Sequence, residues 1–174
     1  MGRKISNYKI AFLGMMLAVA LVLSSFEAFF GAMLALPPGV KLGLANLATM
    51  YTLFYVGRMP AVILVVLKSA FVGLTRSPTA FFLSLCGGML SVLVLIILER
   101  LGNLGLSYIG VSIIGSLFHN VGQLLAASLL LRSSLTLYYS AVLLVSGAAM
   151  GILTGITFEK MLPYLTRLRG RYKE

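Results

Sequence analysis

The segment SLFHNVGQLL (116–125) places a histidine, an asparagine and a glutamine within five positions, inside an apolar run that extends from about residue 108 to 131. Such a run meets the length of about 20 residues that a membrane-spanning helix needs. Each of the three polar side chains then requires a partner within the protein, because hydrocarbon offers no hydrogen bonds. The fold therefore depends on whether the rest of the chain is equally apolar.

The composition is that of a membrane protein. Of the 174 residues 60% are hydrophobic and 10% are charged, and the mean hydropathy is +1.03. A soluble domain carries about 25% charged residues. The single cysteine, Cys86, excludes an intramolecular disulfide, and the sequence contains no Cys/His cluster with zinc-ligand spacing. We therefore predict a polytopic membrane protein with neither a metal nor a cofactor.

Six apolar segments are candidate spanning helices. They cover about residues 8–36, 40–56, 59–74, 78–98, 108–131 and 137–161, and a basic tail follows at 162–174. Connections between them are short, which predicts one all-α domain, a bundle of six transmembrane helices. The second and third segments are near the lower length limit for a crossing. Either they are tilted little, or the loop before the second, PPGVKLGLANL (37–47), folds partly into the membrane.

The basic residues predict the orientation. An even number of spans puts both termini on one side. Under that topology the terminal side carries Arg3, Lys4, Lys9, Arg58, Arg100, Lys160, Arg167, Arg169, Arg171 and Lys173. The opposite side carries Lys41, Arg76 and Arg132. The positive-inside rule then places both termini in the cytoplasm, and basic clusters beside apolar spans favour this role over nucleic-acid binding.

Charged residues inside apolar segments are candidates for a binding site. Lys68 stands about 12–15 Å from either end of the third segment at 1.5 Å per residue, and Glu27 in the first segment is its candidate partner. Lys68 either pairs with Glu27, faces a ligand as a cation, or is neutral. Lys41 is either an interfacial lysine that extends to water or a positive group that guards an outward-facing pocket.

A polar stripe runs along the fifth segment. On a helix, spacings of three and four bring the following residues to one face: Ser112, Ser116, His119, Asn120 and Gln123. Single groups of this kind often make hydrogen bonds between helices. Five together favour a lined cavity. With Asn46 from the second segment, the predicted substrate-binding residues are Glu27, Lys41, Asn46, Lys68, Ser116, His119, Asn120 and Gln123.

Glycines predict close helix contacts in the sixth segment. In SGAAMGILTG (146–155), Gly147, Gly151 and Gly155 form two consecutive GxxxG steps on one helix face. Together with KLGLANL (41–47) and HNVGQLL (119–125), this segment resembles the Gx transporter family of bacterial membrane proteins, whose members are often labelled component I of heptaprenyl diphosphate synthase. That family is similar to the substrate-binding S components of energy-coupling factor (ECF) transporters. The resemblance covers nearly the whole chain.

The resemblance implies a six-helix protein of the bacterial plasma membrane, with an outward-facing pocket capped by the loop after the first helix. It also implies docking through that helix onto a transmembrane scaffold subunit, which is coupled to two cytoplasmic ATPases. The scaffold contact in such proteins uses small residues four apart, matched here by Gly14 and Ala18 with Ala11 nearby. Lys68 stands where the family often has arginine. Lysine keeps the charge but loses the planar bidentate fork.

The leading functional hypothesis is a binding subunit of an ECF-type importer. The family context suggests a small hydrophobic or amphipathic substrate: a quinone or isoprenoid precursor, a flavin or a vitamin-like compound. The chain contains no Walker A motif, so partner ATPases must supply energy. It contains no aspartate either, whereas prenyl diphosphate synthesis uses aspartate-rich clusters to hold Mg²⁺; we therefore predict no enzyme activity. The alternatives are a non-transporting membrane anchor for a flavin-based electron-transfer complex and an accessory subunit of a prenyl diphosphate synthase.

Overall fold

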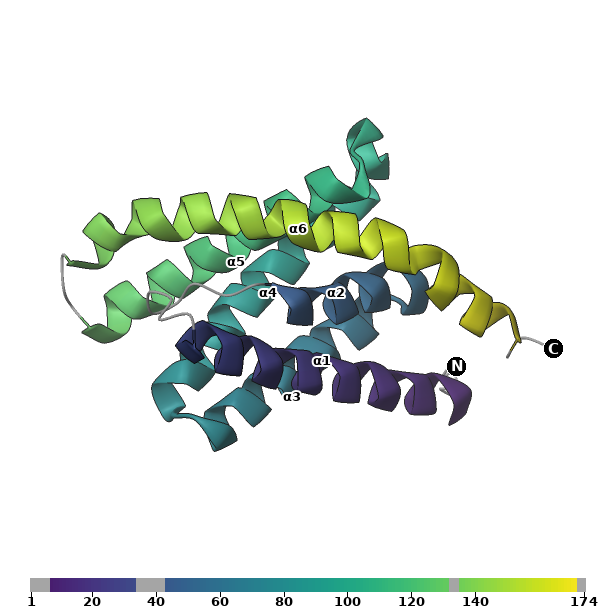
Figure 1. The fold of residues 1–174 in the computed structure, drawn as a ribbon, viewed down its shortest axis with the longest axis horizontal. Helices are drawn as coiled ribbons and strands as arrows, with labels where there is room; N and C mark the ends of the chain where they lie inside the picture. The colour runs from purple at the N-terminus through teal and green to yellow at the C-terminus, as the bar shows by residue number, and fades with distance from the viewer. Residues whose placement is uncertain (1–6, 34–42, 132–134, 172–174) are drawn as a thin grey trace.

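The computed structural model describes residues 7–33, 43–131 and 135–171, and over these residues the chain is almost entirely helical (Figure 1). Its elements are α1 (Asn7–Met33), α2 (Leu44–Tyr51), the π-helical turn η1 (Thr52–Val56), α3 (Arg58–Thr75), α4 (Pro78–Arg100), the 3-10 turn η2 (Gly102–Gly105), α5 (Tyr108–Leu131) and α6 (Leu135–Arg171). The prediction of an all-α protein is confirmed for the described part of the chain.

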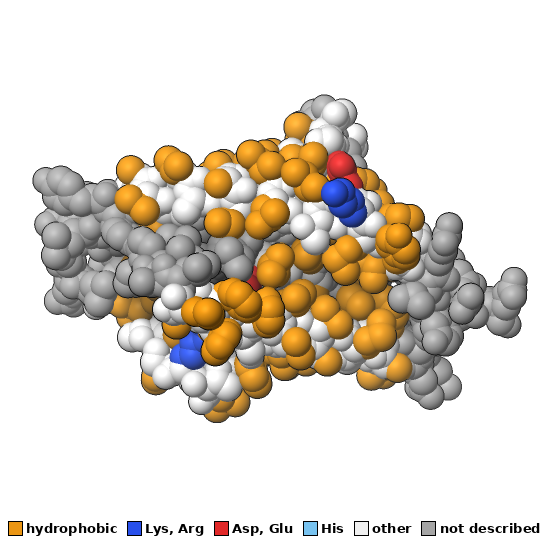
Figure 2. All heavy atoms as spheres, viewed as in Figure 1, with side chains coloured by type: hydrophobic (Ala, Val, Ile, Leu, Met, Phe, Trp, Pro, Cys, Tyr) orange, Lys and Arg blue, Asp and Glu red, His pale blue; other side chains and the backbone are white. Residues whose placement is uncertain are grey.

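Five of these helices, α1, α3, α4, α5 and α6, are long and apolar enough to cross a membrane. Figure 2 shows hydrophobic side chains over most of the described surface of one face, with one blue patch at lower left, one blue-and-red patch at upper right and a small red patch near the centre. Large apolar side chains such as Val22, Phe29 and Leu129 are exposed on the outside of the bundle. Such a surface suits lipid and would aggregate in water. The chain is therefore a multi-pass membrane protein.

The described part of the second predicted segment, 40–56, is too short to cross a membrane by itself, and residues 40–42 lie outside the described residues. The helical stretch Leu44–Val56 rises about 20 Å at 1.5 Å per residue, against a hydrocarbon core of about 30 Å. It begins inside the bundle, where Ala45 N donates a hydrogen bond to Glu27 Oε1 (3.0 Å). Glu27 precedes the end of α1 at Met33 by about two turns. The short helix thus starts beside the body of α1.

Gly43 allows α2 to begin at that depth. Its φ of 78° lies in the left-handed region, which glycine adopts at little cost. A Cβ at Gly43 would also lie 2.9 Å from Thr154 Oγ1 on α6. The carbonyl of Gly43 accepts a hydrogen bond from Asn46 N (2.9 Å). A glycine at this position therefore lets the chain turn closely beside α6 and begin α2.

Close contact between α4 and α5 depends on glycines in both helices. A Cβ on Gly122 would lie 2.6 Å from Cys86 O, and one on Gly87 would lie 2.7 Å from His119 O. Both neighbours are backbone atoms, so the two helices touch through their main chains. This contact places His119 next to α4 and fixes the rotation of α5 about its axis.

The three glycines of the GxxxG steps lie where α6 meets α5. A Cβ on Gly151 would lie 2.7 Å from Ile113 Cα, and one on Gly155 would lie 2.6 Å from Ile109 Cα. A Cβ on Gly147 would meet the side-chain amide of Asn120. This glycine face therefore lets α6 pack directly on the α5 backbone.

The last helix is longer than expected. The basic tail predicts an end near 161, yet α6 continues through Pro163 to Arg171. Leu162 and Leu165 pack against the buried core, and Tyr51 donates its hydroxyl to Leu165 O (3.2 Å). Tertiary packing thus extends the helix through the first part of the predicted tail; residues 172–174 lie outside the described chain. We call the end of the bundle where α1 begins and α6 ends the terminal end (Figure 1).

Candidate functional site

A polar cavity lies between the helices, with lining residues from each of α1, α2, α3, α4, α5 and α6. It has a volume of about 490 Å³, which includes its open mouth. Six of the predicted substrate-binding residues line it: Glu27, Asn46, Lys68, Ser116, His119 and Asn120. We call this space the outer cavity. Of the remaining two predicted residues, Gln123 does not line it, and Lys41 lies outside the described residues.

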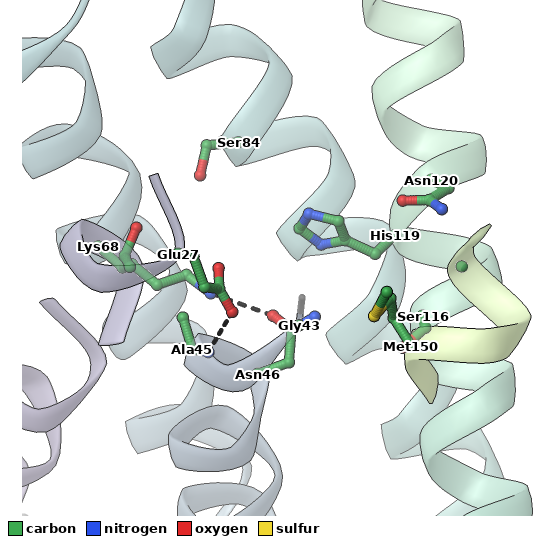
Figure 3. A pocket seen from close by; sticks show the side chains of 12 residues that line it. Glu27, Gly43, Ala45, Asn46, Lys68, Ser84, Ser116, His119, Asn120 and Met150 are labelled. Carbon is green, nitrogen blue, oxygen red and sulfur yellow. Dashed lines mark hydrogen bonds between the residues drawn. The ribbon is translucent and has the colours of Figure 1, made fainter. Parts of the chain in front are cut away.

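One wall of the outer cavity carries both of its charged residues. Lys68 donates a hydrogen bond to Asn46 Oδ1 (3.2 Å), and its side chain lies beside the Glu27 carboxylate (Figure 3). Only 4% of Lys68 and 7% of Glu27 is exposed, so neither charge is solvated at the surface. Asn46 is half-buried and bridges the lysine to α2. Asn46 therefore accepts one hydrogen bond from Lys68, and this wall presents charged and amide groups to the cavity.

The position of each charged residue follows from its helix. On α3 the buried residues Ala61, Leu64, Val65, Lys68, Ser69 and Val72 recur at helical spacing, which turns Lys68 inward. Glu27 faces the first turn of α2, where backbone N–H groups have no partner within the helix. Its negative charge also suits the positive end of the α2 dipole. One carboxylate thus accepts a hydrogen bond at the start of α2 and lies beside a buried lysine.

The opposite wall belongs to α5 (Figure 3). Ser116, His119 and Asn120 are all buried and come from consecutive turns of that helix. Asn120 has a structural role as well, since its amide Nδ2 donates to Leu143 O on α6 (2.5 Å). The polar stripe therefore serves both of the roles that the sequence left open, because part of it lines a cavity and part of it joins two helices.

Gln123 belongs to the contact between helices. It is 3% exposed, and its Cγ lies 2.8 Å from the position of a Cβ on Gly87 of α4. The stripe predicted one cavity for all five residues. The close approach of α4 instead covers the Gln123 end of the stripe.

A second, smaller cavity shares Asn46, Lys68 and Ser116 with the outer one, and its volume of about 330 Å³ includes the open solvent space at its openings. We call it the inner cavity, since its additional residues lie toward the terminal end. Among them are two hydroxyls, Thr49 Oγ1 and Ser112 Oγ, that are buried and have no hydrogen-bond partner among the described residues. Thr49 was not among the predicted site residues, although it follows Asn46 by one helical turn.

Ser84 was also missed. It is buried, lines the outer cavity from α4, and accepts a hydrogen bond from Ser69 on α3 (3.2 Å). Its neighbours Gly87, Gly88 and Ser91 are small residues, a pattern that is typical of helix packing and gave no separate signal for a site.

The small residues of α1 lie on another surface. Ala11, Gly14 and Ala18 are exposed on the outside of the bundle, and nothing lies within 4 Å of the position of a Cβ on Gly14. This face of α1 points away from both cavities and is open to lipid or to a partner.

The donor set of the cavities suits binding by hydrogen bonds and charge. Within the described ranges, no group of three or more His, Cys, Asp or Glu side chains is close enough to hold a metal ion. The outer cavity contains one carboxylate, and that group already accepts the Ala45 N–H. The arrangement can recognise a small molecule through an ammonium, a carboxylate, an imidazole, amides and hydroxyls.

Residues 16–161 match the model of a protein family described as heptaprenyl diphosphate synthase component I. The chain belongs to this family. The match confirms the family resemblance, and it includes every residue that lines the two cavities. Component I is, by its name, one part of a synthase that has further parts. Comparisons with curated proteins and with solved structures each found no match.

Proposed function

We propose that this component I protein is the substrate-binding subunit of an importer of the ECF type. The observation that carries the proposal is the outer cavity, in which a buried lysine and glutamate face polar groups of α5 inside an apolar bundle. Ionisable residues at such a depth are costly and usually mark a substrate or ion pathway. A protein that needed only to anchor a partner would gain nothing from this cavity.

The exposed face of α1 supports docking onto a scaffold subunit. Ala11, Gly14 and Ala18 are exposed, and small residues four apart let two membrane helices approach closely. In this proposal the scaffold helix lies on that face, and two partner ATPases drive reorientation of the bundle. The Glu27 end of the cavity lies near the side of the bundle that is opposite the terminal end. In this proposal the substrate enters from that side.

The test is co-purification from the native host. The tagged full-length chain, solubilised in a mild detergent, should recover a transmembrane scaffold protein and paired ATPases, identified by mass spectrometry. A Gly14→Trp/Ala18→Trp variant should lose them, because the bulky rings block close helix contact. Ala149→Trp is the matched control, since Ala149 is a small exposed residue on α6. Equal recovery with all three chains would refute scaffold docking through α1.

A second candidate function is that of an accessory subunit of a prenyl diphosphate synthase, which the family description favours. The same experiment separates the two. Recovery of a soluble prenyl synthase in place of ATPases would support the accessory role, and loss of synthase activity on removal of this chain would establish it. Recovery of only an extracellular flavoprotein would support an electron-transfer anchor.

A further inference from the structure

The inner cavity continues the outer one toward the terminal end. Asn46, Lys68 and Ser116 line both spaces, so the two cavities adjoin at these residues. Farther toward the terminal end, Thr49 follows Asn46 by one turn of α2, and Ser112 precedes Ser116 by one turn of α5. A ligand in the outer cavity can therefore extend a small group past Lys68 and into the inner cavity.

The inner cavity is rich in donors. Thr49 is 6% exposed and Ser112 is 2% exposed, and their hydroxyls have no hydrogen-bond partner in the described structure. Lysine can only donate, and a hydroxyl can donate to any acceptor that enters. Among its described lining residues the inner cavity has no carboxylate. Two unsatisfied buried hydroxyls cost free energy, which an acceptor placed between them and the lysine would recover.

The outer cavity adds an acceptor to these donors. Glu27 lines it and accepts the Ala45 N–H (3.0 Å), and an ionised carboxylate can only accept hydrogen bonds. The two cavities thus present a carboxylate in the outer cavity and donors in the inner one. A ligand that matches both carries an N–H group at one end and an acceptor group at the other.

Charge balance narrows the chemical class of the ligand further. Lys68 and Glu27 together are formally neutral and lie deep within the bundle. A zwitterionic ligand would keep this buried cluster neutral, whereas a diphosphate would add uncompensated negative charge, which is costly there. Quinones and isoprenoids are recognised mainly by apolar and aromatic walls, and the outer cavity is lined mostly by polar residues.

We propose that the ligand of this protein is a small molecule with a carboxylate and an N–H group, whose carboxylate occupies the inner cavity among Lys68, Thr49 and Ser112. The N–H group faces Glu27 in the outer cavity. This assignment rests on the proposed binding function and replaces the hydrophobic substrates suggested by family context.

Charge-selective labelling of cysteines tests the inner cavity without knowledge of the natural ligand. The background is the full-length chain with Cys86→Ser, which removes the exposed native thiol. Thr49→Cys and Ser112→Cys, each tested alone, report on the inner cavity, and Ser84→Cys reports on the outer one. Ser69→Cys is the control, because Ser69 is fully buried and lines neither cavity.

The probes are two methanethiosulfonates of similar size, one with an ethylsulfonate group and one with an ethyltrimethylammonium group. Each forms a disulfide with the cysteine thiolate and releases methanesulfinate, and intact mass spectrometry follows the rate. With each rate divided by the rate of the same reagent toward a free thiol, we expect the sulfonate to label both inner cysteines on the order of fivefold faster than the cation, as one nearby unit charge predicts. Adding Lys68→Gln leaves the Glu27 carboxylate as the nearby charge, so this normalised ratio should fall to one or below.

Each other result counts against a defined part of the inference. Equal or reversed rates at both inner positions would overturn the anionic subsite. Labelling of Ser84→Cys without labelling of either inner cysteine would overturn the inner cavity as a subsite and leave the outer cavity intact. Absence of labelling at Ser84→Cys as well would overturn the binding function itself. Expected labelling without co-purifying ATPases would keep the subsite and reject the importer.

Discussion

Replacement of Gly122 by alanine tests the close contact that positions α5. The new Cβ would lie 2.6 Å from Cys86 O and 2.8 Å from Gly87 Cα. Both atoms belong to the α4 backbone, so no side-chain rotation can relieve the overlap and the helices must separate. Overpacking of this kind costs about 1–3 kcal/mol of folding free energy. A domain of this size loses about 2–4 °C of unfolding midpoint per kcal/mol.

We therefore expect Gly122→Ala to lower the thermal midpoint by roughly 2–12 °C, measured in detergent at one fixed scan rate. The matched control is Gly14→Ala. Nothing lies within 4 Å of the Cβ position there, and alanine favours a helix by about 0.5–1 kcal/mol over glycine, so its midpoint should stay level or rise. An unchanged midpoint for Gly122→Ala beside a level control would refute the described α4–α5 contact.

Three further substitutions test the site and its surroundings by the same thermal assay. Glu27→Gln removes the carboxylate beside a buried lysine and should lower the free energy of unfolding by about 3–5 kcal/mol. Adding Lys68→Met should restore part of this loss. Strictly additive effects of the two substitutions would show that the two residues are not coupled. Asn120→Ala loses its bond to the α6 backbone and should cost about 1 kcal/mol, so an unaltered midpoint would contradict that bond. Arg58→Gln breaks an ion pair with Glu99 that is partly exposed, so it should cost less than about 1 kcal/mol and cost still less at high salt; a large loss independent of salt would contradict this.

The middle of the chain was predictable from local patterns. The expected helices 59–74, 78–98 and 108–131 differ by at most two residues at either end from α3, α4 and α5. Ser77 accepts a hydrogen bond from Ala80 N, and Pro78 occupies the first turn of α4. Caps and proline positions of this kind are encoded within a few residues, so the sequence alone shows where such helices start.

Two differences from the expected helix bounds both arise from contacts distant in sequence. Apolar length over 40–56 predicted one helix, and its described part starts at Leu44, beside Gly43 near α6 and the carboxylate of Glu27. The basic tail predicted an end of the last helix near 161, but the packing of Leu165 against the core and the hydroxyl of Tyr51 hold α6 beyond it. Neither partner is visible in a local window of sequence.

The sequence by itself determined that polar groups lie within an apolar bundle, because hydropathy and helical spacing are properties of single segments. It also identified Lys68 and the α5 stripe as the groups that need partners. Only the tertiary structure decided how the stripe divides: Gln123 packs on α4, Asn120 joins α6, and Ser112 faces the inner cavity. The physical reason is that a helical period fixes which residues share a face, whereas backbone contacts between helices decide what that face meets.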